Sequence, residues 1–222
     1  MRTCLEIYSG TASFGTIAKE EFGYDLFTID YTPEFNPSLC QNMLLVEKDD
    51  LPKRFQTPTI IWASPPCNKF STGTFHCHNF KNFLTGYAPI KPEAEEALAF
   101  VAKAIVLIDQ LKPRFWFIEN PRGLLKKMPF MEELNYFLNE VCYCQYGDKR
   151  MKPTDIWTNL VWESKPMCYN GCPDHETAHR GDATGTQGLS LADRGRIPIN
   201  LCREILETIE EYNSSVIEFS YI

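Results

Sequence analysis

The first 160 residues alternate short apolar, β-branched runs with helical stretches, and this alternation limits the folds open to the chain. The pattern predicts strands at residues 3–8, 24–30, 59–63 and 114–118, with helices at 16–22 and 92–111. Strands that alternate with helices over this length favour a mostly parallel sheet covered by helices on both faces. The sequence therefore predicts an α/β fold.

Charge and cysteine usage narrow the classes of protein further. The formal net charge is −7, which excludes a generically basic protein that holds nucleic acid by charge alone. Residues 112–203 nevertheless carry 13 Lys and Arg against 11 Asp and Glu, a distribution that fits either a polyanion-binding face or a solvated surface. Nine cysteines in scattered contexts favour free thiols in a reducing compartment.

The sequence offers no segment for a membrane or for export. No apolar run approaches the roughly 20 residues that a membrane span needs. The first residues pass directly into a predicted core strand and leave no room for a signal peptide. We expect a cytoplasmic protein that does not associate with membranes.

Polar side chains follow the ends of several predicted strands, namely Ser9, Asp30, Asp49, Cys67 and Glu119. In an open α/β sheet, ligands bind beyond the carboxyl ends of the strands. The glycine turn at residues 10–15 (GTASFG) is not a P-loop, because Thr and Ile follow it instead of Lys and Ser/Thr. With Asp30 available to accept from ribose hydroxyls, the turn suits a nucleoside-bearing cofactor, although similar turns occur in many α/β folds.

Two further positions carry candidate chemistry. Cys67 follows two prolines at a strand end, which holds a thiol on a stiff, exposed backbone; nearby Lys69 could help to lower its pKa. Glu119 ends a very apolar strand, where partial burial favours the neutral form that can donate a proton. The alternatives are a packing cysteine and a helix-capping acid.

Three motifs resemble those of the DNA (cytosine-5)-methyltransferases and stand in that family's order. Residues 8–15 (YSGTASFG) resemble the S-adenosylmethionine loop, 66–71 (PCNKFS) the Pro-Cys nucleophile motif, and 119–121 (ENP) the Glu-Asn motif. Residues 143–147 and 150–158 are similar to the Arg-x-Arg element, with Lys152 in place of the second arginine. Together with 185–188 (GTQG) and 197–201 (IPINL), the residues of these motifs most resemble those of small methyltransferase-like proteins of bacteriophages and prophages.

The resemblance implies a Rossmann-like S-adenosylmethionine-dependent methyltransferase fold and methyl transfer to C5 of cytosine in double-stranded DNA. Cys67 would add to C6 of a flipped base, Glu119 would hold and protonate N3, and Arg150 would steady the base or the thiolate. Residues 68–87 would form a loop that closes over the base. The cell would be a bacterium or a phage-infected host, and no obligate protein partner is expected.

The resemblance also assigns the cofactor-binding residues. Asp30 would bind the ribose, Tyr31 would stack on the adenine, Asp49 would accept from its amino group, and Pro66 would lie beside the sulfonium. The cofactor loop would be lined by Tyr8, Ser9, Gly10, Thr11 and Phe14.

The resemblance gives a division of the chain. We predict the catalytic domain at 1–160, a short irregular Cys/His-containing region at 161–196 as a reduced target-recognition element, and a C-terminal helix and tail at 197–222 packed on the catalytic domain. The short middle region favours a short or relaxed target sequence over a long one.

The middle region contains the ligand types of a tetrahedral zinc site, namely Cys168, Cys172, His175 and His179. The alternative is a polar loop whose histidines meet DNA phosphate or solvent. Cys142 and Cys144 alternate on a predicted strand and are interpreted as packing residues.

Two other functions remain open at this point. The same nucleophile and acid would serve an RNA cytosine-5 methyltransferase or an enzyme that installs another group. A catalytically weak DNA-binding or interaction protein on the same fold would not need Cys67. The biological role, whether restriction evasion, defence or regulation, is also open.

Overall fold

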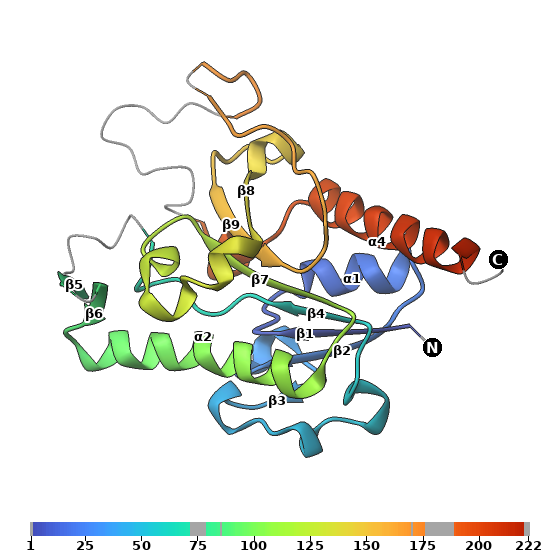
Figure 1. Cartoon of the computed structure of the whole chain (residues 1–222), viewed down its shortest axis with the longest axis horizontal. Helices are drawn as coiled ribbons and strands as arrows, with labels where there is room; N and C mark the ends of the chain where they lie inside the picture. The colour runs from blue at the N-terminus through green and yellow to red at the C-terminus, as the bar shows by residue number, and fades with distance from the viewer. Residues whose placement is uncertain (1, 72–78, 85, 170, 176–188, 220–222) are drawn as a thin grey trace.

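The computed structural model describes residues 2–71, 79–84, 86–169, 171–175 and 189–219. In these residues a seven-stranded sheet has the order β3-β2-β1-β4-β7-β9-β8 (Figure 1). Strand β9 is antiparallel to both neighbours, and the other pairings are parallel. The strands of this sheet are β1 (Thr3–Ile7), β2 (Asp25–Asp30), β3 (Leu39–Cys40), β4 (Ile60–Ala63), β7 (Phe115–Pro121), β8 (Leu138–Cys142) and β9 (Pro153–Thr158).

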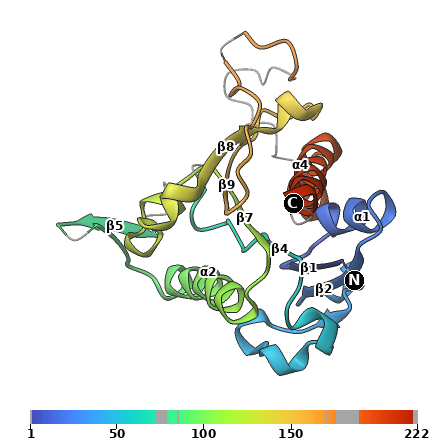
Figure 2. The ribbon, with the colours of Figure 1, turned by 45° about the vertical axis from the view of Figure 1, so that its right-hand side comes forward.

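The helices cover both faces of the sheet, which confirms the predicted α/β fold. Helix α2 (Pro92–Leu111) lies against one face, and α1 (Ser13–Glu20) and α4 (Ile199–Phe219) lie together against the other (Figure 2). Helix α2 has the predicted bounds because a proline starts it and small or apolar residues recur every three or four positions on its buried face. The short helix α3 (Leu191–Gly195) precedes α4.

Each face of the sheet has its own apolar core. On the α1 side, Phe14 stacks on Trp62 with ring centroids 4.3 Å apart, and buried residues of α4 such as Ile205 and Ile209 complete the layer. On the α2 side, residues such as Val101 pack against the opposite face of the strands. Both apolar layers therefore hold the strands of the sheet in a fixed arrangement, including the ends that carry the polar residues.

The central strands end at one level. Ile7 of β1 pairs with Ala63 of β4, and Ala63 pairs with Ile118 of β7. Strands β2 and β3 lie on one side of β1 in the sheet, and β4 and β7 lie on its other side. Ligands of doubly wound sheets bind where the strand order reverses in this way. The segments after β1, β4 and β7 therefore border one site.

The prediction that Asp49 follows a strand is wrong. The apolar residues 44–46 form part of a 3₁₀ turn, η2 (Met43–Leu45), because the Asn42 side chain accepts from the Leu44 N–H and starts the turn. Asp49 lies farther on, exposed in the 3₁₀ helix η3 (Lys48–Asp50). The third strand of the sheet is the two-residue β3.

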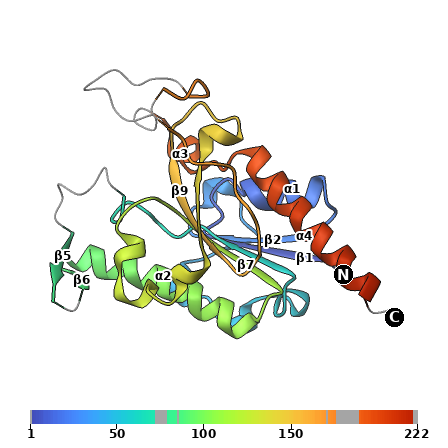
Figure 3. The same ribbon diagram turned by 45° about the horizontal axis from the view of Figure 1, so that its top comes forward.

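A second sheet and an irregular lobe extend from this core. Strands β5 (Phe80–Phe83) and β6 (Gly86–Pro89) form a hairpin that begins within the predicted loop of residues 68–87 and ends two residues beyond it; residues 72–78 and 85 lie outside the described residues. The lobe, residues 161–169 and 171–175, follows β9 and contains no helix or strand (Figure 3). Among the helices of the described residues, none has the length and apolar character needed to cross a membrane.

Candidate active site

Cys67 stands on a tight turn just beyond β4. The carbonyl oxygen of Cys67 accepts from the backbone N–H groups of Phe70 and Ser71, at 3.0 and 3.1 Å. Phe70 is fully buried and stacks on Phe80 of the hairpin. The turn thus anchors its apolar end in the core and leaves the half-buried thiol at the sheet edge.

Glu119 lies in β7 with only 5% of its surface exposed. Its Oε1 accepts from the hydroxyl of buried Tyr143 at 2.9 Å. The Lys152 Nζ is 3.8 Å from the same oxygen and 4.6 Å from the centre of the Tyr143 ring. The carboxylate therefore has a neutral donor and a cation at one oxygen.

Two contacts tie the Cys67 turn to the end of β7. Asn120 donates from Nδ2 to the carbonyl oxygen of Pro65 at 2.9 Å. Beyond it, a Cβ on Gly123 would lie 2.1 Å from the carbonyl oxygen of Phe70, so only glycine permits this approach, and the Leu124 N–H donates to that same oxygen at 2.8 Å. The thiol and the acid are thus held on adjoining segments.

Charges from both segments act on the thiol. Burial raises the pKa of Cys67, and the nearby Glu119 carboxylate raises it further. The cations that lower this pKa are Lys152 and Arg194. They act in place of Lys69, the sequence neighbour from which we expected this effect, because the chain brings residues 152 and 194 back to the sheet edge.

The guanidinium carbon of Arg150 lies 5.8 Å from the centre of the Tyr143 ring, but its ion pair and hydrogen bonds lead away from the thiol. Arg150 pairs with Asp148 and donates to the carbonyl oxygens of Asp193 and Arg196 at 2.6 and 3.1 Å. It therefore fastens the α3 segment to the sheet. Lys152, two residues on, is the cation next to Glu119.

The glycine turn after β1 has the backbone of a ligand cradle. Gly10 and Ala12 adopt left-handed conformations, with φ of 48° and 51°. Asp30 holds the turn, since its carboxylate accepts from the Gly10 N–H at 2.8 Å and the Thr32 N–H at 2.9 Å. A Cβ on Gly10 would meet nothing within 4 Å, so a ligand can approach its backbone.

A buried hydroxyl in this cradle supports a polar ligand. Ser9 Oγ is buried and has no hydrogen-bond partner among the described residues. Since buried polar atoms in folded proteins are nearly always paired, a bound group that reaches Ser9 would complete the pairing. Exposed Tyr31 follows Asp30 and offers a free ring face, and half-buried Pro66 borders the cradle at the next strand end.

Some residues expected to line the cofactor contribute differently. The Phe14 side chain is fully buried in the core, where it stacks on Trp62. Tyr8 has a left-handed φ of 55° and donates its hydroxyl to the Phe100 carbonyl oxygen at 2.7 Å, so its side chain packs on α2. Thr11 borders an open groove of about 710 Å³ that Arg150 and Asn200 also line.

Gln41, and not Asp49, directly follows the third strand of the sheet. Its backbone N–H donates to the Asp30 carbonyl oxygen at 2.9 Å, which places it at the end of β3 beside the cradle. Asp49 instead lies in η3, whose Lys48 bonds the Gln110 carbonyl oxygen of α2. The strand Leu39–Cys40 could have pointed to Gln41 as the residue at the strand end. A strand of two residues, however, has no recognisable periodicity in the sequence.

Glu6 is a buried acid that the sequence argument missed. Its Oε2 accepts from the Gly15 N–H at 2.7 Å under the glycine turn. Burial is the main cause that raises its pKa to about 8. A Cβ on Gly15 would lie 2.5 Å from this oxygen, so the acid and the glycine together set how α1 packs on β1.

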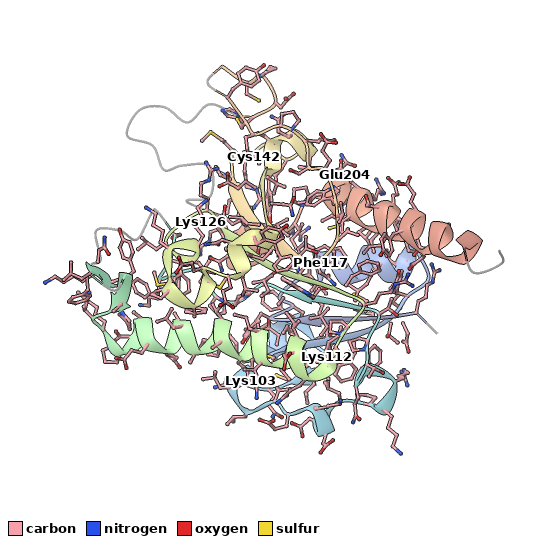
Figure 4. The ribbon with its side chains drawn as sticks, viewed as in Figure 1. Lys103, Lys112, Phe117, Lys126, Cys142 and Glu204 are labelled. Carbon is pink, nitrogen blue, oxygen red and sulfur yellow. The ribbon has the colours of Figure 1, made fainter. Side chains whose placement is uncertain are left out.

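A separate group of cysteines lies at the far end of β8. The ligand atoms of four side chains lie within 4.8 Å of one another, and we call these residues the Cys/His quartet: Cys144, Cys168, Cys172 and His175. Three of them were predicted, whereas Cys144, interpreted as a packing residue on a strand, lies in the 3₁₀ helix η9 (Tyr143–Tyr146). His179 lies outside the described residues. Figure 4 shows Cys142, the last residue of β8, directly beneath this lobe.

Comparison with known proteins gives one relative of matching length. A protein of Frog virus 3 (isolate Goorha), named "Probable DNA (cytosine-5)-methyltransferase", is 26% identical over 220 residues, which cover 91% of this chain and 98% of that protein. No family model matches the chain.

A crystal structure of a prophage-encoded E. coli protein, described as a DNA modification methyltransferase, matches with a TM-score of 0.47 and 14% identity. The match covers 71% of this chain and 46% of that protein, so the chain spans about half of its length. The resemblance to the DNA (cytosine-5)-methyltransferases that the motifs predicted is thus confirmed by the viral relative, with which this chain aligns along nearly its whole length.

Proposed function

We propose that this chain transfers a methyl group from S-adenosylmethionine to C5 of cytosine in DNA. The observation that carries the proposal is the hydrogen bond from Asn120 to the Pro65 carbonyl oxygen, which holds the Cys67 turn beside Glu119. A nucleophile and an acid on adjoining segments suit a reaction in which one base is attacked at one atom and protonated at another. The viral relative carries a name that agrees with this reaction.

The proposed reaction assigns a role to each of the two groups. The thiolate of Cys67 adds to C6 of a flipped cytosine while Glu119 donates a proton to N3, so electron density moves to C5. C5 takes the methyl group that S-adenosylmethionine supplies. Water or another base then takes the C5 proton, the bond between C6 and sulfur breaks to release the thiolate, and N3 returns its proton to Glu119, which leaves 5-methylcytosine.

Lys152 has a double role in this proposal. Its ammonium group lowers the pKa of Cys67, which favours the thiolate, and lies 3.8 Å from Glu119. It thereby offsets part of the burial that favours the neutral thiol. Arg150 acts on the site indirectly, by holding the segment that carries Arg194 through the Asp193 carbonyl oxygen.

The cradle after β1 fits the nucleoside part of the cofactor. The Asp30 carboxylate is already aligned by two backbone N–H groups and can accept from ribose hydroxyls as well. The exposed ring of Tyr31 is available to stack on the adenine, and Gln41 follows β3 beside the cradle, where it would border the base. Ser9 and Pro66 would border the methyl-donating end of the cofactor.

Label transfer tests the proposal directly. The protein is incubated with methyl-labelled S-adenosylmethionine and unmodified duplex DNA, and the DNA is digested to nucleosides. We expect label in 5-methylcytosine, no label with Cys67→Ala, and a loss of at least about a hundredfold with Glu119→Gln. The exposed acid Glu132 supplies the matched control, since Glu132→Gln leaves labelling unchanged.

A mechanism-based trap separates this reaction from the alternatives. DNA that carries 5-fluorocytosine has no C5 proton to lose, so the adduct with Cys67 persists and migrates as a covalent complex on a denaturing gel. Trapping on RNA alone would transfer the proposal to an RNA substrate. DNA binding with neither label nor adduct would leave a binding protein and refute the enzyme.

A further inference from the structure

The Cys/His quartet joins two segments that are far apart in sequence. Cys144 belongs to η9, at the end of the antiparallel part of the sheet, and the other three members lie in the lobe after β9. The Sγ of Cys168 is 3.5 Å from Nδ1 of His175. All four ligand atoms converge within 4.8 Å, although the chain between Cys144 and Cys168 runs through a whole strand.

The donors are those that zinc prefers. Three sulfur atoms and one imidazole nitrogen make a tetrahedral Cys₃His set. Ligand atoms around zinc stand about 3.3–3.8 Å apart, because Zn–S and Zn–N bonds are about 2.3 and 2.0 Å long, so a shift of about 1 Å closes the quartet on an ion. The cysteines of the described residues are free thiols, and no disulfide competes there for these sulfurs.

A neighbouring side-chain amide already donates to two of the sulfur atoms. Gln145 donates from Nε2 to the Sγ of Cys172 at 3.2 Å and lies 3.5 Å from the Sγ of Cys144. N–H donors of this kind stabilise thiolates and orient them toward a metal. A single side chain therefore bridges the sheet-borne ligand and a lobe-borne ligand.

The lobe lacks the means to hold itself together. Its described residues contain no helix or strand, and although Trp162 at its start is buried in the core on the α4 side of the sheet, the buried apolar cluster from Met167 onward consists of cysteines with Met167 packed against them. In that part of the lobe the largest side chain, Tyr169, is 63% exposed. So few apolar contacts cannot offset the entropy lost when a segment of this length is ordered, and a metal cross-link supplies what the core does not.

We propose that the lobe is a zinc-binding element anchored to the sheet, with the ligands Cys144, Cys168, Cys172 and His175. The ligand set differs from the one that sequence order suggests, because Cys144 comes from the sheet. A site with Cys144 cross-links the lobe to the body, whereas a site made within residues 168–179 would only close a local loop.

If the proposed function holds, metal bound at Cys144 also affects the candidate active site. Cys144 follows Tyr143, whose hydroxyl donates to Glu119. A metal that fixes η9 also fixes Tyr143 against the acid. Removal of the metal should therefore lower methyl transfer, while metal content itself is measured without any reference to catalysis.

Metal content of single variants tests the proposal. The full chain, purified without chelator, is expected to carry about one zinc per chain by elemental mass spectrometry. Cys144→Ser and His175→Ala should lower this content at least about tenfold. His179→Ala and the exposed Cys40→Ser should retain it, so the comparison of Cys144→Ser with His179→Ala separates the two ligand sets.

A spectroscopic measurement keeps the test valid if a variant fails to fold. Cobalt(II) exchanged into the unmodified protein should give thiolate-to-cobalt charge-transfer absorption and the strong visible bands of tetrahedral coordination. Absence of both zinc and the cobalt spectrum would overturn the proposal, as would a disulfide among these cysteines in the mass of the native protein. Zinc kept by Cys144→Ser but lost by His179→Ala would overturn the ligand set. These outcomes do not depend on whether the chain methylates DNA.

Discussion

Asn120 and Pro65 are 55 positions apart in the chain, yet the Nδ2 of Asn120 lies 2.9 Å from the Pro65 carbonyl oxygen. Pro65 follows β4 and Asn120 lies near the end of the neighbouring parallel strand β7, so their hydrogen bond converts the alignment of these strands into the alignment of two side chains. Cys67 and Glu119 are each close neighbours of one member of the pair. The geometry of the candidate site therefore depends on one buried amide.

Asn120→Ala should slow methyl transfer and lower stability. The substitution leaves the Pro65 carbonyl oxygen without its partner, which costs about 1–3 kcal/mol of folding free energy. A shift of the Cys67 turn by a fraction of an ångström should lower kcat/KM by about ten- to a hundredfold. Urea unfolding and label transfer measure the two effects.

Asn159 gives the matched control for Asn120. It bonds the Trp116 N–H and the Arg114 carbonyl oxygen at the opposite end of the same strand. Asn159→Ala should lower stability without lowering kcat/KM once folding is accounted for. Equal losses of turnover in both variants would contradict a positioning role for Asn120.

Lys152→Met should raise the pKa of Cys67. Burial and Glu119 already hold this pKa above its ordinary value, and Lys152 opposes both. Without this cation a smaller fraction of Cys67 is thiolate near neutral pH, so alkylation of the Cys67-containing peptide by iodoacetamide should slow severalfold. Its pH profile should move to higher pH. A similar slowing in Lys69→Met would show that the wrong cation has been identified.

Gly123→Ala should disturb the contact between the Cys67 turn and β7. The added Cβ would lie 2.1 Å from the Phe70 carbonyl oxygen, a backbone atom that cannot rotate away. We expect a loss of about 1–3 kcal/mol in stability, measured by urea unfolding, together with reduced label transfer. Gly195→Ala serves as the control, because a Cβ there meets nothing within 4 Å. Full activity in Gly123→Ala would refute the close packing.

Glu6 should make stability fall as the pH rises. Its pKa is about 8 in the folded chain against 4.5 as the ordinary value, so between these limits the folded state binds one proton more than the unfolded state. Its contribution is complete below about pH 4.5 and is lost as the pH rises through about 8. Glu6→Gln should flatten this part of the curve, measured by urea unfolding at several pH values, and an unchanged slope would count against the assignment.

Much of the fold could be predicted from local patterns. The spacing of apolar residues in Pro92–Leu111 has the period of a helix, and the runs around Thr3–Ile7 and Phe115–Pro121 have the composition of buried strands. Parallel strands share a carboxyl edge, so Asp30, Cys67 and Glu119 could be assigned to one site before their contacts were known. The prediction that Asp49 follows a strand was wrong because the Asn-capped 3₁₀ turn before it contains consecutive apolar residues, as a short strand does.

By itself, the sequence determined the type of the sheet, the motifs at its edge and the resemblance that they carry, because each depends on residues that are close in the chain. The tertiary structure alone decided which distant groups meet. Lys152 rather than Lys69 acts on Cys67, and Cys144 rather than a residue of the lobe completes the quartet. Both choices depend on β9 running back antiparallel to β7 and β8, a pairing set by the packing of the whole sheet.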